Sequence, residues 1–166
     1  MTDKDFTTKL KSLTRQRIRL TWQLAQMGAP LSDEDRRMIE VIRAHPEYAD
    51  LWDRLDQLSD AEIERDGTDP ILHVTVHQTV ENQIATGDPP ETAQTVEALM
   101  QAGLSRHEAV HRVGSVVLEE VWHVMREKRP FDRPRFVGKL AELLEPRAPR
   151  PRSPARSPRR RPGRRR

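Results

Sequence analysis

The stretch DPILHVTVHQTVENQIATG, residues 69–87, contains one complete helix together with its start and stop signals. Asp69 can cap the first turn, and Pro70 is a residue type favoured at the first helical position. Gly87 can end the helix, because glycine readily adopts the left-handed conformation found after the last turn. The sequence therefore predicts a helix over residues 70–86.

Two more helices are predicted directly downstream. One begins near residue 89 and stops at Gly103, and the next opens with Ser105 and Glu108, which fit a capping box, and reaches about residue 128. Because both connections are short, we expect three successive antiparallel hairpin partners. The first and third of these helices should then run parallel to each other.

Helical periodicity also dominates the rest of the chain, and no stretch alternates like a strand. A first helix is marked by the apolar residues Leu10, Leu13, Leu20, Leu24 and Met27. A second is predicted around residues 32–42, a third around 48–58, and a short closing helix over 132–145. The prediction is an all-α bundle of six or seven helices forming a single domain over residues 1–145, with N-terminal helices in 5–58 and the histidine-bearing hairpins in 69–128.

Charge is strongly segregated along the sequence. Residues 146–166 contain ten arginines, six prolines and no acid, so subtracting them from the net charge of +3 leaves about −7 on residues 1–145. Such a segment cannot bury a core, and we expect it to be a disordered basic tail. It suits sequence-independent contact with nucleic acid or with an acidic partner, although arginine-rich tails also arise by drift from GC-rich coding.

Composition excludes several kinds of site. The chain has no cysteine, which rules out disulfides, thiolate nucleophiles and sulfur-ligated zinc. There is no apolar run of membrane-spanning length and no signal-peptide pattern at the N-terminus, so a cytoplasmic protein is expected. Any bound metal would be held by nitrogen and oxygen.

Four of the six histidines form two pairs with a spacing of four residues, His73 with His77 and His107 with His111. Each pair occupies one helical face. The first pair lies among Val76, Val80 and Ile84, and the second shares its stripe with Gly114, Leu118, Val121, Trp122 and Met125. Both pairs are therefore expected to face the core and, on parallel helices, to meet at one end of the bundle.

Four inward imidazoles are costly to bury without partners, and one divalent metal would satisfy all of them. Imidazole suits zinc, iron, nickel or copper, and Glu81, one turn beyond His77, could bind the ion or orient a histidine. The alternative is a metal-free network in which neutral histidines bond to one another, to backbone carbonyls and to Glu81. The sequence leaves both open and favours the metal site.

The segment HEAVH, residues 107–111, also matches the H-E-x-x-H signature of zinc proteases, in which the glutamate is the general base. Here Glu108 already has a structural explanation as the third helical residue after Ser105. A metal-dependent hydrolase using Glu108 thus remains a weaker alternative. A metal-free structural or adaptor module whose tail reaches nucleic acid or an acidic partner is the other.

Several segments together resemble a bacterial family of small helical proteins catalogued as domain of unknown function 1841. They are HPEY at residue 45, DPILHVTVHQTVENQ with the following DPP, HEAVH, and LEEVWH, within approximately residues 35–128. The resemblance implies shared positions at His73, His77, Glu81, Gln83, Pro89, Pro90, His107 and His111. Many relatives have a further histidine where this chain has Ala49, and the basic tail is not part of the shared pattern. The resemblance implies a site without naming a reaction, and it adds His45 as a weaker candidate ligand.

Overall fold

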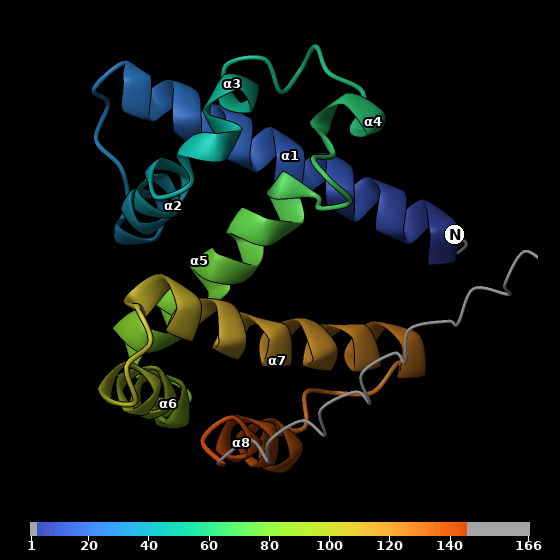
Figure 1. Cartoon of the computed structure of the whole chain (residues 1–166). Helices are drawn as coiled ribbons and strands as arrows, with labels where there is room; N and C mark the ends of the chain where they lie inside the picture. The colour runs from blue at the N-terminus through green and yellow to red at the C-terminus, as the bar shows by residue number, and fades with distance from the viewer. Residues whose placement is uncertain (1–2, 146–166) are drawn as a thin grey trace, which may run out of the picture.

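The computed structural model describes residues 3–145, and the side chains from Thr8 onward; all structural statements below refer to this part of the chain. It is all-α, as predicted (Figure 1). The elements are α1 (Asp3–Gln26), α2 (Asp33–Arg43), the 3₁₀ helix η1 (Pro46–Tyr48), α3 (Ala49–Trp52), α4 (Asp60–Ile63), α5 (Pro70–Thr86), α6 (Pro90–Gln101), α7 (Arg106–Glu127) and α8 (Arg133–Glu142). The expected disorder and binding properties of residues 146–166 lie outside the described residues and stay predictions.

The start and stop signals around α5 act as predicted. The Asp69 carboxylate accepts hydrogen bonds from the backbone N–H groups of Ile71 and Leu72, at 2.9 and 3.1 Å. Gly87 ends the helix at a φ of +68°, a left-handed conformation that glycine adopts without strain. These caps fix where α5 begins and ends.

The helix expected over residues 48–58 is broken into shorter pieces. Only η1 and the four residues of α3 are helical there, and turns follow Trp52. The Arg15 side chain on α1 donates to the backbone carbonyls of Leu55 and Leu58, the first at 2.6 Å through Nε. A side chain from another helix thus satisfies carbonyls that a continuous helix would have used itself.

The core has two parts, and α5 contributes to both. One cluster lies among α1, α2 and the segment that follows α2, and it includes Ile42, Trp52 and Val74. The other lies among α5 to α8 and includes Val80 and Val113. Val74 and Val80 are less than two turns apart, so α5 joins the two clusters (Figure 1).

The expected sense of α5 relative to α7 is wrong. Along the contact, Arg106 pairs with Glu81, whereas the ring of His111 lies beside that of His73, so the two helices pass each other in opposite directions. The reason is α6, which Figure 1 shows almost end-on while α5 and α7 lie across the view. Because α6 is steeply inclined to both neighbours, its two connections do not produce the simple up-down-up order.

The apolar stripes of α1 and α7 are also placed differently from expectation. The core side of α7 consists of residues such as Ala109, Val113 and Val117. The predicted core residues Leu118, Val121, Trp122 and Met125 are 40–52% exposed instead. On α1, Ile18 and Thr21 are buried, whereas its predicted apolar stripe lies outside. Hydrophobic periodicity identified both helices but not which face this chain covers.

No helix within residues 3–145 combines the length and the hydropathy needed to cross a membrane.

Candidate metal centre

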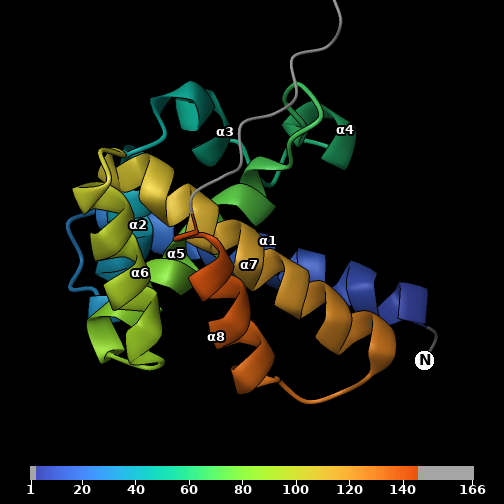
Figure 2. The same cartoon turned by 60° about the horizontal axis from the view of Figure 1, so that its bottom comes forward.

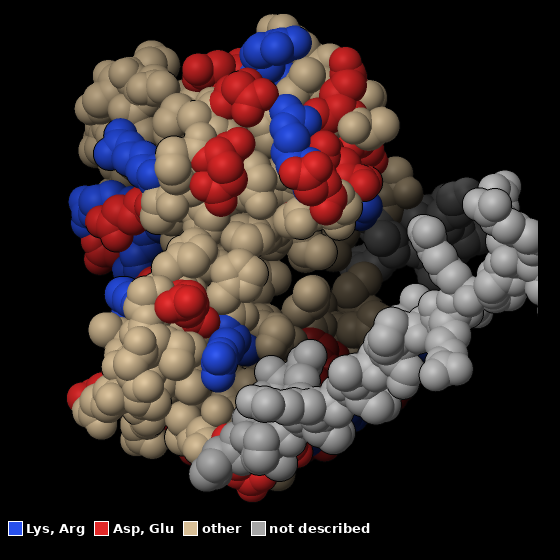
Figure 3. Space-filling model, viewed as in Figure 1, with Lys and Arg blue, Asp and Glu red and all other residues tan. Residues whose placement is uncertain are grey.

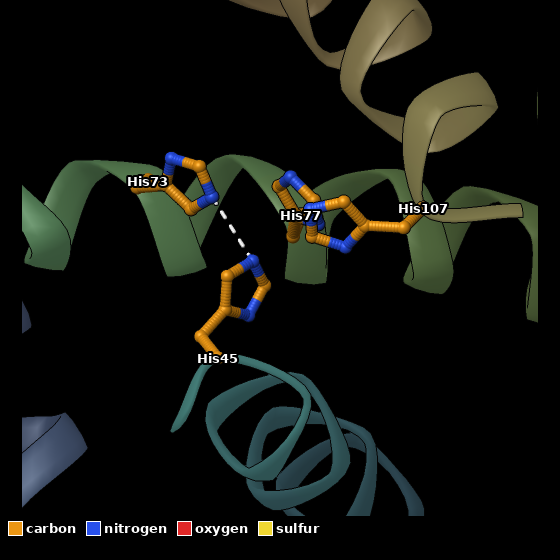
Figure 4. Close-up of side chains that lie close together, drawn as sticks. All are labelled: His45, His73, His77 and His107. Atoms are coloured by element: carbon orange, nitrogen blue, oxygen red, sulfur yellow. Dashed lines mark hydrogen bonds between the residues drawn. The ribbon is translucent and has the colours of Figure 1, made fainter. Parts of the chain in front are cut away.

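Imidazoles from three parts of the chain meet where α5 crosses the start of α7, next to the end of α2 (Figure 4). His73 and His77 come from α5, His107 is the second residue of α7, and His45 follows α2. One ring nitrogen from each of the four lies within 4.8 Å of the corresponding nitrogen of every other. Segments far apart in the sequence thus build one nitrogen-rich cluster.

His45 is held by a backbone hydrogen bond. It is 1% exposed, and its Nδ1 lies 2.7 Å from the Val41 carbonyl oxygen, to which it donates. In a neutral imidazole this leaves Nε2 as the unprotonated nitrogen. That nitrogen faces the cluster and lies 3.0 Å from Nε2 of His73 (Figure 4). A second-sphere carbonyl of this kind commonly fixes the tautomer of a metal-binding histidine.

His77 occupies the middle of the cluster. Its ring centroid lies 4.7 Å from those of His45 and His73 and 5.0 Å from that of His107. The residue is 5% exposed, and its Nε2 has no hydrogen-bond partner among the described residues. A buried polar atom without a partner is uncommon and costs on the order of 1–3 kcal/mol.

Burial and mutual repulsion lower the pKa of three of these imidazoles, those of His73, His77 and His111. Burial lowers the pKa of His77 to about 3 and that of His73 to about 4, and repulsion from the neighbouring His45 is the second-largest cause. Burial and the neighbouring His107 also lower the pKa of His111. At neutral pH these rings therefore carry free lone pairs, the form that binds metals.

His111 and Glu81, both predicted as ligands, lie at the edge of the cluster. The ring centroid of His111 is 4.8 Å from that of His73 and 5.0 Å from that of His77, but its nitrogens are not among the four that converge. Glu81 Oε2 accepts a hydrogen bond from Arg106 at 2.5 Å. The roles of His111 and Glu81 as ligands stay predictions. His45 lies closer to His73 than their separation of 28 residues along the chain suggested.

Glu108 takes the capping position predicted for it. Ser105 Oγ accepts from the backbone N–H of Glu108 at 3.2 Å, and the Glu108 carboxylate accepts from the backbone N–H of Ser105 at 2.9 Å. These hydrogen bonds to Ser105 also lower the pKa of Glu108. The carboxylate that a zinc protease would use as a base is thus engaged in closing the first turn of α7.

Two pockets reach the cluster. The larger, of about 460 Å³, is lined on one side by His45, His77 and His107. Its other lining residues include two guanidinium groups, of which Arg106 binds Glu81 and Arg37 donates to Asn82 at 2.7 Å. The smaller, of about 300 Å³, is reached past Leu72 and Leu118 and ends at His73 and His111. The larger pocket is therefore bordered by two arginines, and the smaller by Leu72 and Leu118 together with Asp69 and Ser115.

The family model described as domain of unknown function (DUF1841) matches residues 11–142. The match covers most of the chain and extends beyond the 35–128 segment that carries the resemblance, so the protein belongs to this family. No significant match was found among curated proteins or among solved structures.

Proposed function

We propose that this member of the DUF1841 family is a metal-binding protein that holds one divalent transition metal through His45, His73, His77 and His107. The observation that carries the proposal is the buried Nε2 of His77, which has no partner among the described residues although three other imidazoles surround it. A metal-free network would be expected to satisfy this nitrogen, because a buried polar atom without a partner is costly.

The spacing of the nitrogens supports the same interpretation. Metal–nitrogen bonds of about 2.1 Å separate two ligands by about 3.4 Å in a tetrahedral site and by about 4.2 Å when they lie opposite each other. The four nitrogens lie within 4.8 Å of one another, and the two on His45 and His73 are 3.0 Å apart. Small rotations of the rings are enough to bring all four lone pairs to one ion.

The donor set narrows the class of ion. Imidazole nitrogen suits zinc, iron and nickel, and the absence of cysteine excludes sites that depend on sulfur. Four neutral ligands leave the full positive charge on the ion. An open position facing the 460 Å³ pocket would therefore attract water or a small anion, beside Arg37 and Arg106.

Elemental analysis of the full-length, untagged protein tests the proposal. We expect one zinc, iron or nickel ion per chain after purification, or after addition of the metal and dialysis. Binding should raise the midpoint of thermal unfolding, because the ion binds the folded state. The His77→Ala variant should lose the metal while retaining its helical circular dichroism.

His123→Ala provides the matched control. His123 lies outside the cluster, where its Nδ1 bonds Glu127 at 2.6 Å, so its removal should leave the metal content unchanged. The proposal is wrong if the folded wild-type protein takes up none of the three metals, or if His77→Ala retains the ion as firmly as the wild type does.

A further inference from the structure

An exposed stripe of large apolar side chains runs along the outer face of α1. It consists of Leu10, Leu13, Leu20, Leu24 and Met27, which are 36–79% exposed. The intervals of three and four residues are those of a heptad seam, with Arg17 at the one intermediate position that is not apolar. The Arg17 side chain forms an ion pair with Glu34 at 2.7 Å. The stripe therefore has the pattern of a helix that packs against another helix.

A second stripe occupies the last three turns of α7. Leu118, Val121, Trp122 and Met125 are 40–52% exposed and share one face of the helix. Leu118 and Val121 continue the same three-and-four spacing from Gly114, which touches Val76 on α5. Beyond that crossing, no helix within residues 3–145 covers this face extensively, since its four side chains stay 40–52% exposed, and α6 and α8 pack on the buried side of α7.

The two helices that carry the stripes extend in the same direction from α5. Figures 1 and 2 both show the N-terminal half of α1 and the C-terminal half of α7 extending past α5 in one direction. Figure 3 shows the surface hollowed between the upper and lower parts of the molecule. Leu72 on α5 is 45% exposed and lines the 300 Å³ pocket together with Leu118, His73 and His111.

The amount of uncovered apolar surface is that of an interface. The five side chains of the α1 stripe, the four of the α7 stripe and Leu72 are 36–79% exposed, and together they offer apolar area on the scale of the roughly 800 Å² that one partner contributes to a standard protein–protein interface. The largest apolar patch on a typical monomer is roughly 300–600 Å². The two stripes therefore exceed what a monomer usually leaves in water.

We propose that these stripes form the interface with a second copy of this chain, in which α1 of each copy packs along α7 of the other. A second copy is favoured because one chain carries two long stripes with matching heptad spacing. A two-fold arrangement pairs the α1 stripe of each copy with the α7 stripe of the other, and it covers the whole α7 stripe and part of the longer α1 stripe. The helix of the partner also covers the 300 Å³ pocket at His73 and His111. The histidines then remain accessible through the 460 Å³ pocket beside Arg37.

Light scattering coupled to gel filtration tests the interface. At micromolar concentration the full-length protein should have twice the chain mass of 19.3 kDa, with or without a chelator. Leu20→Glu and Trp122→Glu, made separately, should each give a monomer, since a buried carboxylate on either stripe opposes packing. Met100→Glu is the matched control, because Met100 on α6 is 41% exposed but belongs to neither stripe.

Cross-linking tests how the stripes pair. The natural chain has no cysteine, so Leu20→Cys and Leu118→Cys can be introduced into separate samples and mixed. Oxidation should link the two variants to each other more than either variant to itself. A monomeric wild type, a dimer that survives both glutamate variants, or links formed only between identical variants would overturn the proposal. None of these outcomes depends on metal content, which is measured separately.

Discussion

One face of α7 changes character along its length. At its beginning, His107 and His111 face the imidazoles of α5, and the polar atoms there are crowded together and short of hydrogen-bond partners. Three turns later, Leu118, Val121 and Trp122 lie on the continuation of that face and are 40–52% exposed. His107 and His111 are themselves exposed, but the polar half of α7 that carries them packs against α5, whereas the apolar half lies open to solvent.

The two proposals account for this contrast, one through a metal ion at the imidazoles and the other through a second copy of the chain over the stripes. Crowded neutral imidazoles are stabilised by a cation, and uncovered heptad stripes are stabilised by another helix. Gly114 lies between the two halves, where α5 and α7 come closest. Changes in either half, and at this glycine, therefore distinguish a metal-binding region from a packing surface.

The largest effect is expected from changing ligands within the polar half. His45→Gln should weaken metal binding by about 100-fold or more, because its Nε2 is one of the four converging nitrogens. His111→Gln should weaken binding by less than about tenfold, because its nitrogens lie outside that set. Competition with a chromophoric chelator measures both affinities. Equal losses would mean that His111 is as much a ligand as His45.

Acid should destabilise the metal-free protein next most strongly. Burial holds the pKa of His73 near 4 and that of His77 near 3, below their ordinary value of 6.5. As the pH falls below 6.5 the unfolded chain therefore binds protons that the folded protein refuses, and the free energy of unfolding decreases. Between pH 7 and pH 5 the midpoint of thermal unfolding should fall by on the order of 5 °C in chelator.

The variant His77→Gln serves as the control for this pH dependence. It removes one of the groups that resist protonation, so the fall between pH 7 and pH 5 should become smaller. Glu120 does not interfere, since its hydrogen bonds with Arg129 keep its pKa at about 2. A pH profile that is identical in the two proteins would contradict the assignment to this cluster.

The junction between the two halves should respond to a single methyl group. A Cβ at Gly114 would lie 2.9 Å from Cγ1 of Val76, so Gly114→Ala should lower the free energy of unfolding by about 1 kcal/mol. Gly138→Ala on α8 meets no atom within 4 Å and should raise it by about 0.5–1 kcal/mol. Urea unfolding compares them, and adding Val76→Ala should restore the stability of the Gly114 variant.

The smallest effect is expected at Glu108. Glu108→Gln should cost about 0.5–1 kcal/mol of stability through its weakened capping interaction, and it should leave the metal content unchanged. Urea unfolding and elemental analysis give the two readouts. A stable variant that lost its metal would show that the carboxylate serves the cluster rather than the helix end.

Local signals made much of the fold predictable. The cap at Asp69, the stop at Gly87 and the capping box at Ser105 depend on neighbouring residues, and the structure has each of them at the predicted place. The relative direction of α5 and α7 depends instead on how steeply α6 is inclined, which follows from packing rather than from connection length. Short connections alone therefore led to the wrong sense.

The candidate site was predictable to a similar extent. Spacing within a helix identified the pair His73 and His77. Its convergence with His107 was predicted from parallel helices and a buried apolar stripe, whereas α5 and α7 pass in opposite directions and the stripe is exposed. His45 belongs to the same cluster through a turn after α2, where no periodicity exists to indicate its direction. The HPEY segment was the only signal for it. For Leu118 to Met125, periodicity showed an apolar stripe but could not show that this stripe is exposed in the folded chain.

Because the core has two parts, a metal ion bound in the histidine cluster would connect them. His45 lies beside the part of the core that contains Trp52, and His107 lies beside the part that contains Val113. Helix α5 connects the two parts. An ion bound at their junction would couple the two halves into a single cooperative folding unit. Without the ion, each half can unfold in its own transition. The number of unfolding transitions seen by calorimetry would therefore indicate whether the metal is bound.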